Sequence, residues 1–206
     1  DMGVWSFDAM KILVTGDGGM IYLKDPEMVG QAKEFLYLGL PGQAKSGLDS
    51  SNHDAWWTYE INRPGRRAIM NDIAGAIGTV QIQKLPAFIA RRKQIDQMYR
   101  EGLSGIDWLV TCPDIPHDCI SSYYMFWIQT AKRNQLARYL RDHGIYTTFR
   151  YWPLHMIDYY QYHGARLPGA ELAAATTLNI PIHQSLTDEE VNKIVETIKS
   201  FPASRA

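Results

Sequence analysis

The spacing of apolar and polar residues predicts two strands and a helix at the start of the chain. Short apolar runs at 4–7 and 20–23 are typical of strands. Pro26, followed by an acidic residue, suits the first turn of a helix that reaches about Leu36, because proline lacks the amide that would otherwise stay unsatisfied there. Residues 39–54 are rich in Gly, Ser, Asn and Asp without a clear period, which predicts a long loop.

Two further helices are expected on either side of Pro86. Asn71 or Asp72 can cap the first helix. Apolar residues follow at roughly helical spacing with small residues between them, which implies close packing against another element: Ile73, Ile77, Val80 and Ile82. After Pro86 a basic helix begins, and its Arg91-Arg92-Lys93 run is interpreted as a solvated face.

Beyond Gly105 the pattern changes and predicts an α+β unit. Its expected elements are strands at 108–110, 123–130 and 146–151, a helix at 134–143 that stops at Gly144, and a final helix. Thr187 and Glu190 form a capping box that opens the final helix. The chain therefore divides into two regions, 1–85 and 86–206.

Composition narrows the functional classes. The 206 residues are 46% hydrophobic and 21% charged with a net charge of -1, which is typical of a globular protein and gives no general attraction to nucleic acid or an anionic membrane. No uninterrupted run of about 18 apolar residues exists, so no membrane-spanning segment is expected. The first residues lack the regions of a signal peptide and open directly in strand-like sequence, as though the chain began inside a domain.

The two cysteines, Cys112 and Cys119, lack the CxxC spacing of a metal site. One bridge between them is an alternative, but two reduced thiols in a cytoplasmic protein is the preferred interpretation.

Lys11 lies among apolar residues, close to Ser6 and to the glycine-rich stretch 16–19. Apolar surroundings disfavour a charged ammonium, and a neutral amine can attack a carbonyl to form a Schiff base. Hydroxyls and glycine-turn amides are natural phosphate donors. A lone lysine of this kind is more often a side chain that reaches past apolar neighbours to water. Ile21 stands where G-x-G-x-x-G would need its last glycine, which argues against a dinucleotide site.

Four motifs in order resemble those of the DegT/DnrJ/EryC1/StrS aminotransferases, a fold-type I family that uses pyridoxal 5'-phosphate (PLP). They are Ser6-Phe7…Lys11…Gly16-Asp17-Gly18-Gly19, Pro64–Gly78 with Gln81 and Leu85, Arg150-Tyr151-Trp152-Pro153-Leu154-His155, and 179–183 with 186–191. The resemblance implies an α/β fold in which 1–85 is the carboxy-terminal part of the large PLP-binding domain. Residues 86–206 would then be the small α+β domain.

The resemblance also implies roles for individual residues. Lys11 would hold PLP covalently and move the proton between the substrate carbon and the cofactor carbon, and Ser6 would bind the cofactor phosphate. The family has its active sites at the interface of a homodimer, and the segment Arg66–Asn71 would reach the partner's phosphate. The remaining expected contacts are Arg67 and Asn71 for the cofactor and Arg150, Tyr151 and His155 for the nucleotide sugar.

The chain departs from the family pattern at three positions. Asp8 stands where the family commonly has His, and Ile69 stands where it has the Asn that reaches the partner subunit, so Arg67 or Asn71 would have to replace that Asn. Arg150 replaces the first His of H-Y-x-P-L-H. It could grip a pyrophosphate through paired hydrogen bonds or be a surface arginine, and the two interpretations carry equal weight.

The resemblance implies a cytoplasmic aminotransferase that moves an amino group, from glutamate as donor, to a nucleotide-linked keto-deoxysugar. The Arg150–His155 and Gly65–Asp72 motifs resemble a subgroup that acts on dTDP-4-keto-6-deoxyhexoses, which favours amination at C4 over C3. The family's dehydratase branch has His in place of the lysine, so Lys11 argues against it. The alternative from another class is a noncatalytic dimerising or regulatory module that keeps the family fold.

In this family the aspartate that protonates the pyridine nitrogen, the aromatic that stacks on the ring and the glycine-turn phosphate site precede the lysine. The chain is therefore expected to be a fragment. His155 and His183 are interpreted as structural residues rather than catalytic bases. Trp56, Trp57 and Tyr59 could stack on a nucleotide base, although hydrophobic filling is the commoner use of such residues.

Overall fold

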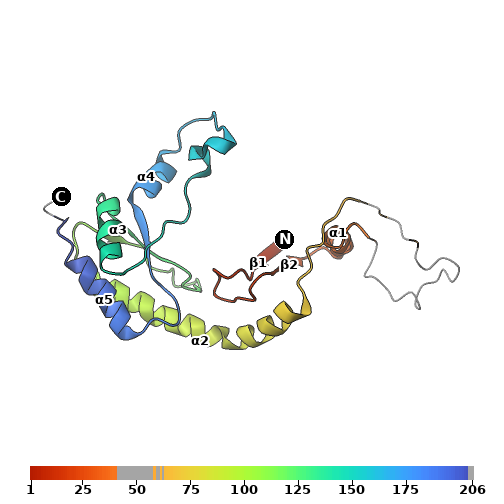
Figure 1. The fold of residues 1–206 in the computed structure, drawn as a ribbon, viewed down its shortest axis with the longest axis horizontal. Coiled ribbons are helices and arrows are strands. Elements are labelled where there is room, and N and C mark those ends of the chain that lie inside the picture. The colour runs from red at the N-terminus through yellow and green to blue at the C-terminus, as the bar shows by residue number, and fades with distance from the viewer. Residues whose placement is uncertain (41–57, 59–60, 62, 204–206) are drawn as a thin grey trace. The chain divides into compact units, whose positions relative to one another are not determined.

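The computed structural model describes residues 1–40, 58, 61 and 63–203. The chain forms two compact units, Asp1–Leu85 and Pro86–Ala206 (Figure 1). That the first unit belongs to a large cofactor-binding domain, and the second to a small domain, stays a prediction. The expected loop at 39–54 lies almost wholly outside the described residues.

A β-hairpin opens unit 1. Strand β1 (Met2–Ser6) pairs antiparallel with β2 (Gly19–Leu23), and the register joins Met2 to Leu23 and Ser6 to Gly19. Both strands were predicted from their apolar runs. The long connection between them is tied back by backbone bonds from Phe7 N to Gly18 O at 2.9 Å and from Thr15 N to Phe7 O at 3.0 Å.

Helix α1 (Pro26–Leu36) confirms the predicted helix at both ends. Pro26 occupies the first turn, and the Asp25 carboxylate accepts a hydrogen bond from Glu27 N at 2.9 Å, which satisfies an amide that the helix leaves unpaired. After α1, Tyr37 forms an isolated antiparallel bridge with Arg67. The segment that precedes the next helix therefore lies against the end of α1.

Helix α2 (Asp72–Gly102) is a single helix of 31 residues with Pro86 inside it. The expectation of two helices divided by Pro86 is therefore wrong. A proline within a helix removes one hydrogen bond, but neighbouring turns and packing can carry the helix through. Asn71 Oδ1 accepts a hydrogen bond from Ala74 N at 2.9 Å, which confirms the predicted cap.

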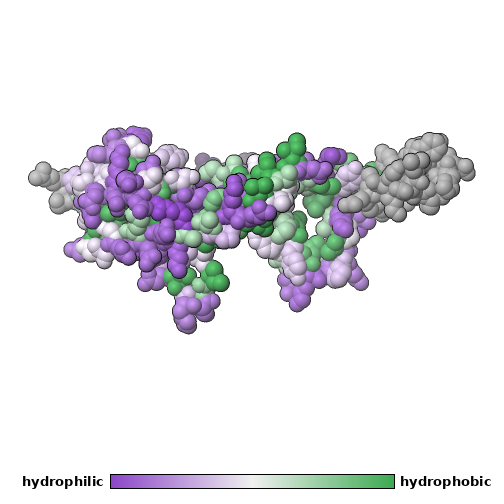
Figure 2. Space-filling model, turned by 90° about the horizontal axis from the view of Figure 1, so that it is seen from below, coloured by the Kyte–Doolittle hydropathy of each residue, from purple (hydrophilic) through white to green (hydrophobic). Residues whose placement is uncertain are grey.

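The amino-terminal stretch of α2 exposes its apolar residues instead of burying them against another element of the described chain. The exposed fractions are 76% for Ile73, 43% for Ile77, 49% for Val80 and 59% for Ile82. Figure 2 shows hydrophobic residues at the surface over this stretch. One close approach does occur, because a Cβ on Gly78 would lie 3.1 Å from Thr15 Cγ2.

By length and composition alone, α2 could cross a membrane, contrary to the prediction that no segment could. A single helix of this kind is weak evidence, since helices that pack against protein pass the same test. The carboxy-terminal part of α2 does pack in this way, because Ile95 and Tyr99 are fully buried in the core of unit 2.

Unit 2 has a small antiparallel sheet in the order β3 (Val110–Thr111), β4 (Phe126–Gln129) and β5 (Thr177–Ile180). Alternate residues of β4 face the core, as the two-residue period of a strand requires. The core joins the sheet to α2, α3 (Arg133–Asp142) and α5 (Asp188–Lys199). The predicted capping box of α5 is present, with Thr187 and Glu190 bonded reciprocally.

Residues 146–151 do not form the predicted strand. Only Thr148 pairs with a strand residue, through an isolated antiparallel bridge to Asn179. The chain then leaves the sheet through two short 3-10 helices, η2 (Leu154–Met156) and η3 (Asp158–Tyr160), and returns through α4 (Pro168–Thr176). We call residues 150–176 the projecting segment. The sequence pattern did not predict α4.

Candidate active site

Lys11 lies on a backbone-braced turn in the connection of the β1–β2 hairpin. Its amide donates to Asp8 O at 2.9 Å, and the Asp8 carboxylate accepts from Met10 N at 2.9 Å. Asp8, which stands where the resembling family commonly has His, therefore shapes the turn that carries the lysine. Lys11 is half-buried and Ile12 beside it is buried, so the turn that carries the lysine is held partly within unit 1.

Ser6, Arg67 and Asn71 line one hollow of about 870 Å³ in unit 1. This volume is within the usual range for a cofactor or ligand pocket, about 300–1,000 Å³. Lys11 is not among the lining residues. The structure thus brings three of the four predicted cofactor contacts to one hollow and leaves the lysine outside it.

The hollow is mainly apolar, with a few polar and charged groups. Val4, Trp5, Met20 and Ile21 come from the hairpin, and Lys33 of α1 adds a cation that sequence reasoning missed. The guanidinium of Arg67 lies 5.8 Å from the centre of the Tyr37 ring, a distance typical of a cation–π contact.

Asn71 already has one structural task, since its Oδ1 caps α2. A phosphate contact would therefore have to use its amide nitrogen, which is a donor and suits an anion. Ile69, at the position of the family's partner-contacting Asn, also lines the hollow and is 56% exposed.

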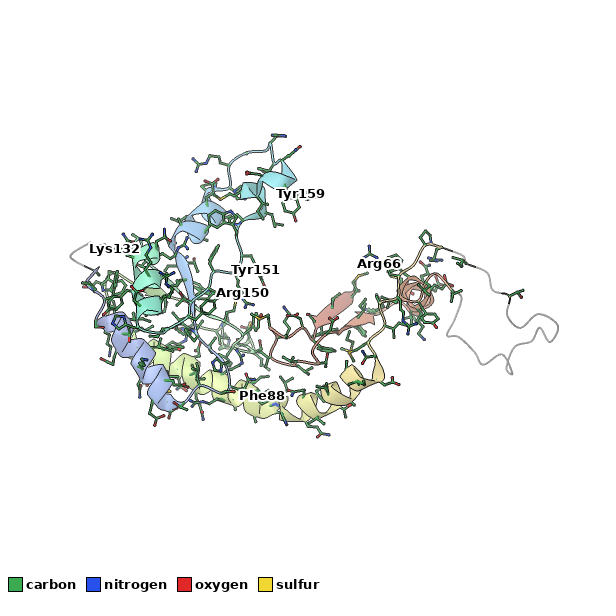
Figure 3. The ribbon with its side chains drawn as sticks, viewed as in Figure 1. Arg66, Phe88, Lys132, Arg150, Tyr151 and Tyr159 are labelled. Carbon is green, nitrogen blue, oxygen red and sulfur yellow. The ribbon has the colours of Figure 1, made fainter. Side chains whose placement is uncertain are left out.

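In unit 2, Arg150 is held by a neutral partner. Its Nη1 donates to the Tyr124 hydroxyl at 3.0 Å, and this is its one hydrogen bond within the described chain. Figure 3 shows Arg150 and Tyr151 next to each other at the start of the projecting segment. Tyr151 is 71% exposed, so it is accessible to a ligand.

His155 points into the projecting segment rather than out of it. Its side chain is 10% exposed, and Nε2 lies 3.5 Å from Glu171 Oε1, an ion-pair distance rather than a good hydrogen bond. Glu171 also pairs with Arg166, whose hydrogen bonds hold the pKa of that carboxylate below its ordinary value. This placement fits the structural interpretation of His155, and its contact with a nucleotide sugar stays a prediction.

Arg92 is buried, contrary to the expectation that the basic run of α2 forms a solvated face. Its side chain donates to the carbonyls of Tyr123 and Tyr124, both at 3.2 Å, and of Ile182 at 3.0 Å. A fourth bond reaches Gln184 Oε1 at 3.2 Å. Burial lowers the pKa of Arg92 from its ordinary value. Burial, followed by the Arg92 charge, also lowers the pKa of His183.

A model of the DegT/DnrJ/EryC1/StrS aminotransferase family matches residues 1–199. The chain belongs to this family. A dTDP-4-dehydro-2,3,6-trideoxy-D-glucose 4-aminotransferase of Saccharopolyspora spinosa is 43% identical over 199 residues, which cover 95% of this chain and 51% of that protein.

Solved structures of aminotransferases share the fold. The aminotransferase TlmJ from Streptoalloteichus hindustanus has a TM-score of 0.89 at 44% identity, over 100% of this chain and 53% of that one. A sugar aminotransferase of Streptococcus pneumoniae, solved in a PMP form, has a TM-score of 0.83 at 26% identity, over 97% of this chain and 52% of that one. The chain spans about half the length of the aminotransferases it matches.

The residues of this DegT-family chain fit the PLP that the family uses. An amine on a braced turn, a hydroxyl at the end of β1, a guanidinium and an amide nitrogen are the groups that an aldehyde and a phosphate require. Two further residues, Tyr124 and Glu171, could not be found from the motifs. They contact Arg150 and His155, which lie 26 and 16 positions away in the sequence. Trp56, Trp57 and Tyr59 lie outside the described residues.

Proposed function

We propose that this chain supplies the catalytic lysine of a PLP-dependent aminotransferase. The observation that carries the proposal is Lys11 on its braced turn, five residues after Ser6, in a chain of the DegT/DnrJ/EryC1/StrS family. PLP, when bound, draws electrons from the substrate carbon and so makes its proton easier to remove. Lys11 Nζ would take that proton and return it, while Ser6 of the same subunit, with Arg67 of the partner subunit and Asn71 of the partner subunit, would hold the cofactor phosphate.

The substrate that we propose is a nucleotide-linked keto-deoxysugar, specifically a dTDP-4-keto-6-deoxyhexose, with glutamate as the amino donor. The 43% identical relative is named as a 4-aminotransferase of a dTDP-linked deoxysugar, which supports amination at C4. Arg150 would bind the diphosphate, because a guanidinium can give two parallel hydrogen bonds to phosphate oxygens. Tyr151 would contact the same ligand from the exposed side of the segment.

The decisive experiment is borohydride reduction of the native protein, followed by intact mass measurement and peptide mapping. Reduction fixes a lysine-bound cofactor as a stable pyridoxyl group. We expect this group on Lys11 in the wild type and in Lys24→Ala, which alters an exposed lysine just beyond the same hairpin. Lys11→Ala should lose both the adduct and transamination. A wild-type protein without an adduct on Lys11 would contradict the proposal and favour the noncatalytic module.

We also propose that the protein is a cytoplasmic homodimer with shared active sites, in which Arg67 and Asn71 serve the partner's cofactor. Mixed dimers test this. Lys11→Ala and the double variant Arg67→Ala/Asn71→Ala should each be inactive alone. After co-refolding, half of the dimers should be hybrids with one intact site each, which gives about a quarter of the wild-type activity. No recovery, with hybrid dimers shown to form, would place all these residues in the site of one subunit.

A further inference from the structure

We propose that Tyr124 is a positioning residue that orients Arg150 for the diphosphate of the nucleotide sugar. The inference rests on the proposed function, which makes a nucleotide sugar the substrate. Its basis is the hydrogen bond of 3.0 Å from Arg150 Nη1 to the Tyr124 hydroxyl, between two partly buried residues. The two residues are 26 positions apart and come from different segments of unit 2.

Tyr124 can orient another side chain because its own backbone is fixed. Arg92 is 5% exposed and donates to the carbonyls of Tyr123 and Tyr124, so the loop is bonded to a residue within α2. Tyr123 has a φ of 51°, in the left-handed region that non-glycine residues seldom adopt, and its amide donates to Ser121 Oγ at 3.0 Å. The backbone is thus held by hydrogen bonds at Tyr123, just before Tyr124, and at the carbonyl of Tyr124 itself.

The chemistry of Tyr124 suits an arginine that must bind an anion. A carboxylate partner would neutralise the guanidinium, whereas a phenol accepts one hydrogen bond and leaves the positive charge in place. Within the part of the chain that the structure describes, Arg150 forms no ion pair and bonds only to Tyr124. Its other N–H groups remain available, and a guanidinium presents them in a planar fork that matches two phosphate oxygens.

This arrangement predicts where the loss of the Tyr124 hydroxyl should appear. Without that bond, Arg150 would have to be ordered when the ligand binds, so affinity for the diphosphate should fall. Reaction at the sugar carbon depends on Lys11 and should be preserved once the substrate is bound. The half-reaction with glutamate involves no diphosphate and should be unchanged.

Tyr124→Phe tests the inference in the native holoenzyme, since it removes one oxygen and keeps the ring. Tyr123→Phe is the matched control, because the Tyr123 side chain forms no hydrogen bond in the described chain. The hydrogen bonds of Tyr123 come from its backbone amide and carbonyl, which the substitution keeps. We expect about a tenfold rise in KM for the nucleotide sugar, as for the loss of a hydrogen bond to a charged group. The inhibition constant of inorganic pyrophosphate should rise by the same factor, with kcat within about twofold. Tyr123→Phe should change none of these.

A double-variant cycle with Arg150→Lys makes the test sharper. Once Arg150 is replaced, Tyr124→Phe should cost no further pyrophosphate affinity. Equal effects of the two tyrosine variants, an undiminished loss in the Arg150→Lys background, or a slower half-reaction with glutamate would each overturn the positioning role. If pyrophosphate affinity depends on Tyr124 while the wild-type protein transfers no amino group to the sugar, the positioning role stands and the proposed function fails.

Discussion

The two units of the chain bury their apolar residues to different extents. Unit 2 encloses a continuous cluster drawn from α2, α3, α5 and the sheet. The described residues of unit 1 bury only Ile12 and Ala74 among their hydrophobic residues, and leave Val4 and Ile73 more than 70% exposed. Because burying one large aliphatic side chain contributes roughly 1.5–3 kcal/mol, unit 2 has a source of stability that unit 1 lacks within these residues.

The difference teaches that regular secondary structure and stability are separate properties. Unit 1 has a paired hairpin, a capped helix and a turn that presents Lys11. Each of these is fixed by local hydrogen bonds and capping. A family chain that spans about half of its relatives can therefore keep the local geometry of the lysine site while its apolar surfaces stay uncovered.

The largest expected effect comes from two Ile→Ala variants on α2. Ile95 is fully buried in unit 2, so Ile95→Ala should lower the free energy of unfolding by about 2–5 kcal/mol through lost burial and a cavity. Ile73 is 76% exposed, and Ile73→Ala should change it by less than about 0.5 kcal/mol. Urea denaturation followed by circular dichroism measures both. Equal losses would show that Ile73 is covered in the native assembly.

Arg92→Leu should produce the next largest effect. It leaves three backbone carbonyls and the Gln184 amide oxygen without their donor, which we expect to cost about 3 kcal/mol. Lys93→Leu is the control, because that exposed neighbour should change stability little. A thermal scan compares the two variants. Similar melting temperatures would mean that water replaces the guanidinium and that the Arg92 hydrogen bonds add nothing to the stability of unit 2.

Thr187→Ala should have a smaller effect. It removes the cap of α5 and should cost about 1 kcal/mol. Thr79→Ala changes an exposed threonine within α2 and should be neutral or slightly stabilising, since alanine has the higher helix propensity. Chemical denaturation of both variants shows whether a local change has a larger cost in the unit with its own core. A destabilised Thr79→Ala would contradict this comparison.

The smallest expected effect is a dependence on pH in unit 2. Burial, then the Arg92 charge, lower the pKa of His183 below its ordinary 6.5. Just below pH 6.5 the unfolded chain therefore binds more protons than the folded chain, so the free energy of unfolding falls as the pH drops through this interval. His183→Gln should remove that slope in denaturation curves between pH 7.5 and pH 5. An unchanged slope would assign it to other groups.

Local signals were sufficient where a structure depends on neighbours in sequence. The bounds of α1, the Asn71 cap and the Thr187 capping box follow from residues two or three positions apart, and all are present. The two strands of the hairpin follow from short apolar runs. The family could also be recognised from sequence, because its motifs hold the chemistry in short stretches.

Predictions failed where distant residues decide the outcome. Pro86 lies inside a helix whose later turns are stabilised by the unit 2 core, so the local cost of proline did not end the helix. Arg92 is buried because carbonyls 31 to 90 residues away accept its hydrogen bonds. The bond between Tyr124 and Arg150, and the turn of His155 toward Glu171, likewise join segments that no local pattern connects.

The continuity of α2 has a consequence for the order in which the chain folds. Starting a helix is costly because several residues must be fixed before the first hydrogen bond forms, whereas each added residue is cheap. The carboxy-terminal turns of α2 are fixed by packing in unit 2, so the exposed turns around Ile77 can grow from an existing helix. During synthesis the exposed turns emerge first, and they must wait for the later half of the chain to supply that nucleus.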